Sequence, residues 1–421
     1  MLENQVFFSK VGFFLKQNWV ELSILLFIAL FPFGEVMHVA LLPLFFYALR
    51  HLFVKELYQQ PWMRAYLLLL ALLFVPILLS TFTALVLDRH LEVVIQWAFY
   101  IVVGIFLVSR FRQRMNESLL LYGVAGLIML SAFDGIMQFL LGFNMLGNPM
   151  VGGRVTSFFY PRVRMTDLAY LSPFVFEAIR RFAVRGGLHR LAWLLVLPLA
   201  ISVFLGGSRS AWIVMALMAV IYIAYLLYRR EFPVLMFVLV CLGAVLTVYA
   251  SIQMSSGVKG RVDRTLLAFT GNAEDLNRAT TTRIDIYKDA ITVISQYPWL
   301  GVGRYGFKES ELFVSTERQG GAHRQAHLII LDVPVNTGLV GLVGYILAFG
   351  WLVALTWRAA RERNGMAFAM AAATSVLMMP LNTAYGFYDV RPAALGLILL
   401  SLTFVYLPKH EAAPAGVLKE T

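Results

Sequence analysis

The sequence predicts an all-α polytopic membrane protein, and its composition and the spacing of its apolar and basic residues lead to this fold class. Of its 421 residues, 60% are hydrophobic and only 14% are charged, whereas a soluble globular protein carries about 25% charged residues. The apolar residues gather in runs of about 20, the length of a helix that crosses a bilayer. The single cysteine, Cys241, excludes an internal disulfide framework.

About twelve transmembrane helices are expected from these runs. No small-residue cleavage site follows the first run, which favours a membrane span over a signal peptide. The sixth run is interrupted by Pro173 and Glu177. In the tenth, Asp332 and Pro334 precede Gly338, so we expect a short helix at the membrane face before the span itself. The expected spans are residues 19–33, 36–54, 64–87, 91–109, 117–142, 166–182, 188–206, 210–228, 232–250, 328–357, 364–383 and 392–408.

The positions of Lys and Arg orient these helices. With the N-terminus in the cytoplasm, every inner segment holds at least two basic residues, which satisfies the positive-inside rule. Twelve spans then return the C-terminus to the cytoplasm. The remaining basic residues of this chain, whose formal net charge is +11, lie at the outer face, where the rule does not require them. We therefore expect an anionic ligand on that side.

The longest polar stretch, residues 251–327, is the segment large enough for an extramembrane subdomain. It contains a helical pattern from Thr280 to about Gln296, and Pro298 with several glycines then indicates turns. The chain is expected to divide into transmembrane helices 1–9 over residues 1–250 with a small periplasmic loop at about 143–165, the large periplasmic loop over 251–327, transmembrane helices 10–12 over 328–408, and a cytoplasmic tail over 409–421.

Several catalytic motifs are missing from the sequence. It has no P-loop for ATP, no zinc-protease motif, no Asp-x-Asp pair to hold Mg²⁺ against a diphosphate, and no Cys-His cluster for zinc. If the protein is an enzyme, it is expected to use neither nucleotide nor metal, and no cofactor. Its activated substrate would then be one available outside the cytoplasmic membrane.

Outer-face arginines are the main candidates for ligand binding. Arg209 lies in a Gly-Gly-Ser-Arg-Ser segment between the seventh and eighth spans. Either its guanidinium extends to lipid headgroups, or its planar fork clamps a lipid-linked phosphate. Arg283, on the helix of the large loop, and Arg304, in the glycine-rich turn after it, are either solvated loop residues or further phosphate ligands.

His327 lies where the large loop meets the tenth span, and three interpretations stay open. It could be a structural histidine. It could bind a metal together with His323, four residues earlier, although no third ligand is evident. It could also be a general base, because the reference pKa of histidine is about 6.5 and leaves the side chain largely neutral at pH 7.

Two further outer segments are candidates for the site. In the last outer loop, Asp389 either pairs with Arg391, which we favour, or orients a catalytic group. In the small loop, Arg154 and Arg164 could contact a glycan or a phosphate of the substrate. Binding to the phosphates of membrane lipids explains these two arginines equally well.

Taken together, these segments resemble the O-antigen ligase family, within the O-antigen ligase/polymerase group of polytopic membrane glycosyltransferases. The resemblance covers roughly residues 150–345, and the twelve spans and the large outer loop agree with it. One departure is Leu328, because many members carry Asn after the histidine. The matching features are Ser208-Arg209, the helix with Arg283 leading to Pro298 and Gly301-x-Gly303, and His327 eleven residues before Gly338-Leu-x-Gly341.

The resemblance implies a metal- and ATP-independent, inverting glycosyltransferase at the periplasmic face of the bacterial inner membrane. Such an enzyme transfers O-antigen polysaccharide from undecaprenyl diphosphate to lipid A–core, and no nucleic-acid partner is expected. On this view, Arg209 and Arg283 clamp the departing diphosphate and His327 is the general base. Weaker candidates for substrate contact are Arg154, Arg164, Arg304, His323 and Asp389.

Three alternatives remain at this level. An O-antigen or exopolysaccharide polymerase shares the donor chemistry and differs in its acceptor. A protein O-oligosaccharyltransferase of the same group is less favoured, because only about 13 residues follow the last span. A lipid-linked glycan transporter or flippase would be expected to bury charged residues along a pathway through the spans.

Overall fold

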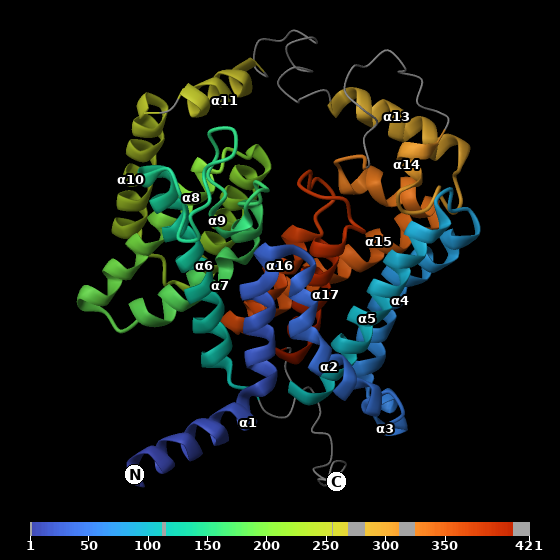
Figure 1. Cartoon of the computed structure of the whole chain (residues 1–421), viewed down its shortest axis with the longest axis horizontal. Helices are drawn as coiled ribbons and strands as arrows, with labels where there is room; N and C mark the ends of the chain where they lie inside the picture. Colours follow the sequence, from blue (N-terminus) through green and yellow to red (C-terminus); the bar gives the residue numbers. More distant parts are fainter. Residues whose placement is uncertain (1, 112–114, 255, 268–282, 311–324, 407–421) are drawn as a thin grey trace.

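The computed structural model describes residues 2–111, 115–254, 256–267, 283–310 and 325–406. Over these ranges the chain is all-helical and contains only isolated β-bridges outside the helices (Figure 1). The α-helices are α1 (Leu2–Leu30), α2 (His38–His51), α3 (Lys55–Gln59), α4 (Pro61–Leu79), α5 (Leu87–Phe111), α6 (Glu117–Leu141), α7 (Thr166–Ala183), α8 (Val196–Leu205), α9 (Arg209–Arg229), α10 (Val234–Met254), α11 (Ser256–Leu266), α13 (Arg283–Gln296), α14 (Gly306–Glu309), α15 (Ile329–Arg361), α16 (Gly365–Leu377) and α17 (Val390–Tyr406). Short 3₁₀ helices are η1 (Phe31–Met37), η2 (Ser80–Phe82), η3 (Ser157–Phe159) and η4 (Gly187–Leu195).

A helix lies at each of the predicted membrane ranges. Within the described residues, seven helical segments are long and apolar enough to cross a membrane, and the first of them, Gly12–His51, joins two predicted spans. The helices α16 and α17 are apolar but shorter, and so is the apolar part of α10, Val234–Ala250. The structure thus confirms a multi-pass helical protein, while the count of twelve spans and their orientation stay predictions.

The expected break in the tenth range is present. Gly338 lies inside α15 with φ +65° and ψ −166°, so the backbone turns between a short first part and the long apolar remainder. The short part holds Asp332 and Pro334, as expected from the sequence. The helix predicted from Thr280 to about Gln296 is also confirmed from Arg283 onward as α13, and its first three predicted residues lie outside the described ranges.

The helix with the weakest sequence signal, α7, is central to the bundle. It packs against α6, α9 and α16, and its residues from Thr166 to Ile179 are all buried. Glu177, which interrupts the apolar pattern, is fully buried and forms ion pairs with Arg180 and Arg181. A buried carboxylate is tolerated when it is paired in this way, which is why the polar interruption does not end the helix.

The segments around α11 and α13 lie at one end of the bundle, and the start of α1 lies at the other (Figure 1). The helix α13 packs on α15 through a second apolar cluster, separate from the main core. Its buried members are Ile286, Ala290, Val293, Val302, Phe307, Ala326 and Val335. This cluster attaches the described part of the large loop to the first part of α15, next to the predicted histidine. The division into domains expected from the sequence stays a prediction.

Candidate functional site

The glycines after α13 allow the chain to lie directly on the kink of α15. Gly301 has φ +65°, and a Cβ atom there would stand 2.5 Å from the carbonyl oxygen of Val335. At Gly338 a Cβ atom would meet the carbonyl group of Trp299 at 2.1 Å. The backbone amide of Val302 donates to the Val335 carbonyl at 2.9 Å. The two glycine motifs noted in the sequence are therefore the two sides of one backbone contact.

This contact places Arg304 against the last loop. Arg304 is 2% exposed, and its guanidinium forms an ion pair with Asp389. Burial acts to lower the pKa of Arg304, but the carboxylates of Asp389 and Asp332 together raise it above its ordinary value. The expectation that Asp389 pairs with Arg391 was wrong, because the packing of the glycine-rich turn on α15 brings Arg304 to this carboxylate instead.

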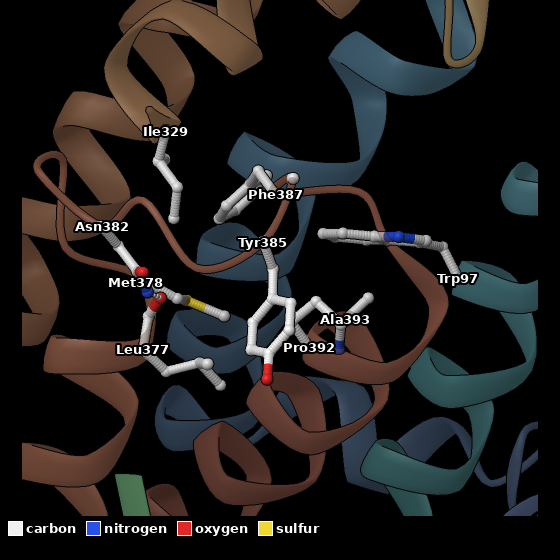
Figure 2. A pocket seen from close by; sticks show the side chains of 10 residues that line it. Trp97, Ile329, Leu377, Met378, Asn382, Tyr385, Phe387, Pro392 and Ala393 are labelled. Carbon is white, nitrogen blue, oxygen red and sulfur yellow. Dashed lines mark hydrogen bonds between the residues drawn. The ribbon is translucent and has the colours of Figure 1, made fainter. Parts of the chain in front are cut away.

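The loop that carries Asp389 is fixed by aromatic packing. Phe387 lies between Trp97 on α5 and Tyr345 on α15, with ring centroids 5.9 and 5.2 Å apart, and its backbone amide donates to Asp332 at 2.8 Å. Figure 2 shows Phe387 and Tyr385 beside a cavity of about 10 Å³. This volume holds at most about one water, so the cavity is a packing feature and not a place for a sugar.

His327 is held from the same loop through Gln325. The side-chain oxygen of Gln325 accepts from the backbone amide of Gly386 at 2.8 Å. The amide nitrogen of Gln325 must then face the Nδ1 atom of His327, 3.1 Å away, and donate to it. In this arrangement a neutral imidazole carries its proton on Nε2 and its lone pair on Nδ1.

The backbone of His327 adopts φ +52°, in the left-handed region. A residue with a Cβ atom is uncommon there, and the conformation costs about 1–3 kcal/mol. Such strain persists where the surroundings hold it, and here the next residues begin α15 while the Ala326 amide donates to Asp332 at 3.3 Å. With the backbone in this conformation, Nδ1 of the imidazole lies 3.1 Å from the side-chain nitrogen of Gln325.

A group of arginines from separate segments forms what we call the outer arginine cluster. The positive charges of Arg283, Arg264 and Arg154 each act on the guanidinium of Arg209. Burial lowers the pKa of Arg261, and the charges of Arg154 and Arg264 lower it further. Like charges held this close repel one another, and an anion bound among them would relieve the repulsion. The cluster consists of Arg154, Arg209, Arg261, Arg264 and Arg283.

Local structure explains how these side chains meet. Gly207 has φ +62°, and a Cβ atom there would stand 2.6 Å from Nη1 of Arg261, so glycine lets α11 approach the start of α9. Nη2 of Arg261 donates to the Gly152 carbonyl at 3.0 Å, next to Arg154. Within the described part of the chain, Nη1 of Arg261 is buried without a hydrogen-bond partner.

The small loop that carries Arg154, predicted to lie at the outer face, is held to α6 by hydrogen bonds. Asp134 accepts from the Met145 amide at 2.6 Å and from the Ser157 hydroxyl at 2.8 Å. Gln138 accepts from the Thr156 amide at 2.7 Å. Buried polar side chains on a membrane helix thus hold the loop by its backbone.

The predicted residues fall into separate groups. The structure brings Arg154, Arg209 and Arg283 together, and no described contact joins His327 to them. His323 lies outside the described residues. Neither of the two described cavities is lined by His327 or by the outer arginine cluster.

Two residues of these groups, Gln325 and Arg261, were missed by the sequence reasoning. The signal for Gln325 was its position two residues before His327, and the signal for Arg261 was its place among the unexplained outer cations. As to metals, no group of three or more His, Cys, Asp or Glu that could hold an ion lies within the residues the structure describes.

The bundle of apolar helices, with an arginine cluster at one end, defines a multi-pass membrane protein with a candidate anion site. A family model described as O-Antigen ligase matches residues 194–346. This range runs from α8 into α15 and contains Arg209, Arg283 and His327. The match confirms the resemblance to the O-antigen ligase family. No curated protein sequence matches the chain.

Proposed function

We propose that the protein is an O-antigen ligase that transfers O-antigen polysaccharide from undecaprenyl diphosphate to lipid A–core at the periplasmic face of the bacterial inner membrane. The observation that carries the proposal is that Arg154 and Arg283, from distant segments of the chain, lie near enough to Arg209 for their positive charges to act on its guanidinium. A diphosphate is the anionic part of such a donor, and guanidinium groups match its oxygens in a bidentate manner.

In the proposed reaction, an oxygen of the acceptor sugar attacks the anomeric carbon of the donor glycan. The bond from that carbon to the diphosphate breaks, and its electron pair leaves with the lipid diphosphate. One displacement of this kind inverts the anomeric carbon. Arg209 and Arg283 would stabilise the charge that develops on the leaving group, and each such fixed donor is typically worth about 3–4 kcal/mol.

His327 is proposed to take the proton of the acceptor hydroxyl. In the described geometry the imidazole lone pair is on Nδ1, and it accepts a hydrogen bond from the Gln325 amide. A neutral hydrogen bond of this kind contributes about 0.5–1.5 kcal/mol. An acceptor hydroxyl can replace the amide at that modest cost, whereas general base catalysis contributes about 10²–10⁴-fold, roughly 3–5 kcal/mol. The proposal also requires the donor glycan to extend from the outer arginine cluster to His327.

A polymerase of the same group is the second candidate, since only the acceptor differs. A transporter is disfavoured by four acidic residues of the apolar helices, Glu21, Asp134, Glu177 and Asp332, because each has a structural partner. Glu21 accepts from the Asn116 amide at 2.8 Å. Asp134, Glu177 and Asp332 bind loop amides or arginines. Charges satisfied in this way do not form an open pathway.

The test uses purified protein, undecaprenyl-diphosphate-linked glycan and three separate acceptors: lipid A–core, a second lipid-linked glycan, and a protein. We expect transfer to lipid A–core. Transfer only to the second lipid-linked glycan would identify a polymerase and overturn the ligase proposal. Undiminished activity after exhaustive chelation is expected, and a loss restored by Mg²⁺ would contradict the metal-independent mechanism.

The residue roles are tested in the same assay. His327→Ala should lower the turnover number by about 10²–10⁴-fold, while the control His189→Ala, at an exposed histidine on η4, should leave it unchanged. Arg209→Lys and Arg283→Lys should be poorly active, because Lys lacks the planar fork. Wild-type rates in the His327 variant would remove its role as base, and full activity of both Lys variants would remove the bidentate clamp.

A further inference from the structure

A second group of basic side chains lies away from the outer arginine cluster. Arg391, in the first turn of α17, is acted on by the positive charges of Arg164 and Arg162. The guanidinium of Arg164 stands over the Tyr385 ring, 5.2 Å from its centroid. Tyr385 in turn lies beside Asp167 in the first turn of α7 and interacts with its carboxylate. The start of α7 and the start of α17 therefore meet here.

Arg391 is unusually placed for a charged residue. Its side chain is 9% exposed, and a Cβ atom on Gly34 would stand 2.7 Å from its Nη2 atom. Its Nη1 atom is buried without a hydrogen-bond partner among the described residues. Asp389, the nearest carboxylate in sequence, is engaged by Arg304. A buried guanidinium that lacks a full set of partners is energetically unfavourable, and a bound anion would compensate its charge.

The charges of this group do not balance. The charges of Arg164 and Arg391 both act on the carboxylate of Asp167, and Arg162 adds a third positive charge that acts on Arg391. Asp167 is 3% exposed, and its Oδ2 atom has no hydrogen-bond partner within the described ranges. The uncompensated charge is of the sign and size that a phosphate would match. Arg162 is exposed and Arg164 half-buried, so the group is open on one side.

We infer that Arg162, Arg164 and Arg391 form a second anion site, which binds a phosphate of the lipid acceptor while the outer arginine cluster binds the diphosphate of the donor. This inference rests on the proposed function. The inference extends the proposed function, because it assigns each lipid substrate to its own arginine group, which would bind the phosphates of that substrate.

The chain connects this site to the proposed base. Tyr385, which contacts Arg164, is followed by Gly386, whose backbone amide donates to Gln325. Gln325 in turn donates to His327. Tyr385 and Gly386 are neighbours in the last loop. An acceptor whose phosphate is bound by Arg164 would therefore be held next to the residue that positions Gln325 and, through it, His327. The small outer loop runs from Arg154 in the first cluster to Arg164 in the second.

The test measures KM for each substrate separately in Arg391→Ala, Arg391→Lys and Arg164→Ala. In the two Ala variants, KM for phosphorylated lipid A–core should rise about 10–100-fold, because each variant loses charge-assisted hydrogen bonds to the phosphate. The turnover number and KM for the donor should stay within about twofold. Arg89→Ala is the matched control, because Arg89 is an exposed, predicted outer-face arginine that pairs only with exposed Glu92 among the described interactions. It should change none of these values.

Phosphatase-treated lipid A–core identifies the phosphate that is bound. The inference requires the penalty of Arg391→Ala to disappear with this acceptor, and an equal penalty would overturn it. An increase in KM for the donor alone would assign the site to the donor. A penalty seen in vesicles with phosphatidylglycerol but absent in phosphatidylcholine would assign it to membrane headgroups. Either result overturns the inference.

Binding without turnover separates this inference from the proposed function. Native mass spectrometry of the purified protein should show that phosphorylated lipid A–core binds the wild type and, about 10–100-fold more weakly, Arg164→Ala. Arg164 is half-buried, so this variant is expected to fold, and a thermal unfolding scan checks it. Equal binding by folded Arg164→Ala and the wild type would overturn the second site. Weakened binding with no glycan transfer by the wild type would support the site and refute the ligase proposal.

Discussion

At the scale of single residues, hydrogen-bond direction decides what the candidate base can do. Gln325 is oriented by the Gly386 amide and therefore donates to Nδ1 of His327. The lone pair that would accept a proton is then on Nδ1, beside the amide. The identity of the residue at position 325 consequently governs which imidazole nitrogen is reactive.

We predict opposite outcomes for two substitutions of Gln325. In Gln325→Glu, the carboxylate can still accept a hydrogen bond from the Gly386 amide, but it can only accept one from His327 as well. Nδ1 must then carry the proton and no longer has a lone pair, so activity should fall by about 10²-fold or more. In Gln325→Leu, the Nδ1 lone pair loses its hydrogen bond to Gln325 and becomes free to accept a proton, so the turnover number should stay within a few-fold. Steady-state kinetics and the imidazole ¹⁵N spectrum measure both effects. Full activity of Gln325→Glu would place the reactive lone pair on Nε2.

At the scale of helices and loops, close backbone contact and ion pairing set the positions of the site segments. The kink at Gly338 lets α15 receive the turn after α13. At the opposite end of the α7 helix, Arg180 donates to Glu231 at 2.9 Å and to Glu177 at 2.7 Å. The first contact joins α15 to the turn after α13, and the Arg180–Glu231 pair joins α7 to the segment between α9 and α10.

Replacement of Gly338 by Ala should destabilise the protein by several kcal/mol, because the new methyl group would overlap the Trp299 carbonyl in a left-handed backbone conformation. Gly350→Ala on the same helix is the control. A Cβ atom there meets nothing within 4 Å, so the change should be neutral or stabilising by up to about 1 kcal/mol. Thermal unfolding in detergent measures both. Equal stability of the two variants would refute the account of the kink.

The Glu231 pairing predicts a dependence of stability on pH. Burial acts to raise the pKa of Glu231, but hydrogen bonds from Arg229 and Arg180 hold it below its ordinary value. A carboxyl whose folded pKa is depressed stabilises the protein above its unfolded pKa, about 4.3, and loses this contribution as the pH falls through the folded pKa. Unfolding temperatures between pH 7 and pH 3 should therefore fall less for Glu231→Gln than for the wild type. Parallel profiles would contradict the prediction.

At the scale of the whole molecule, the orientation of the protein in the membrane determines from which compartment the arginines are accessible. The basic residues predict that α11 and α13 face the periplasm, and they lie at the same end of the bundle (Figure 1). The candidate residues of both arginine groups depend on this sidedness, since their proposed ligands are presented from the outer leaflet.

Cysteine labelling tests the orientation. In a Cys241→Ser background, Lys308→Cys should react with a membrane-impermeant maleimide in intact spheroplasts. Arg358→Cys should react only after the membrane is opened. Both side chains are exposed, at 47% and 43%, so accessibility within the fold does not limit the reaction. The reverse pattern would place the arginine groups in the cytoplasm and refute the proposed function.

The sequence by itself determined the helical class, the position of each apolar helix and the break at Gly338, and it predicted a surplus of arginines at the outer face. These features depend on the composition of consecutive residues and on the helix length that the bilayer thickness requires, and both can be read along the sequence. Tertiary structure alone decided that Asp389 pairs with Arg304, 85 positions away, that Gln325 holds His327, and that the arginines form two groups. Such contacts depend on which helices pack together, and a linear pattern of hydrophobic residues does not contain that information.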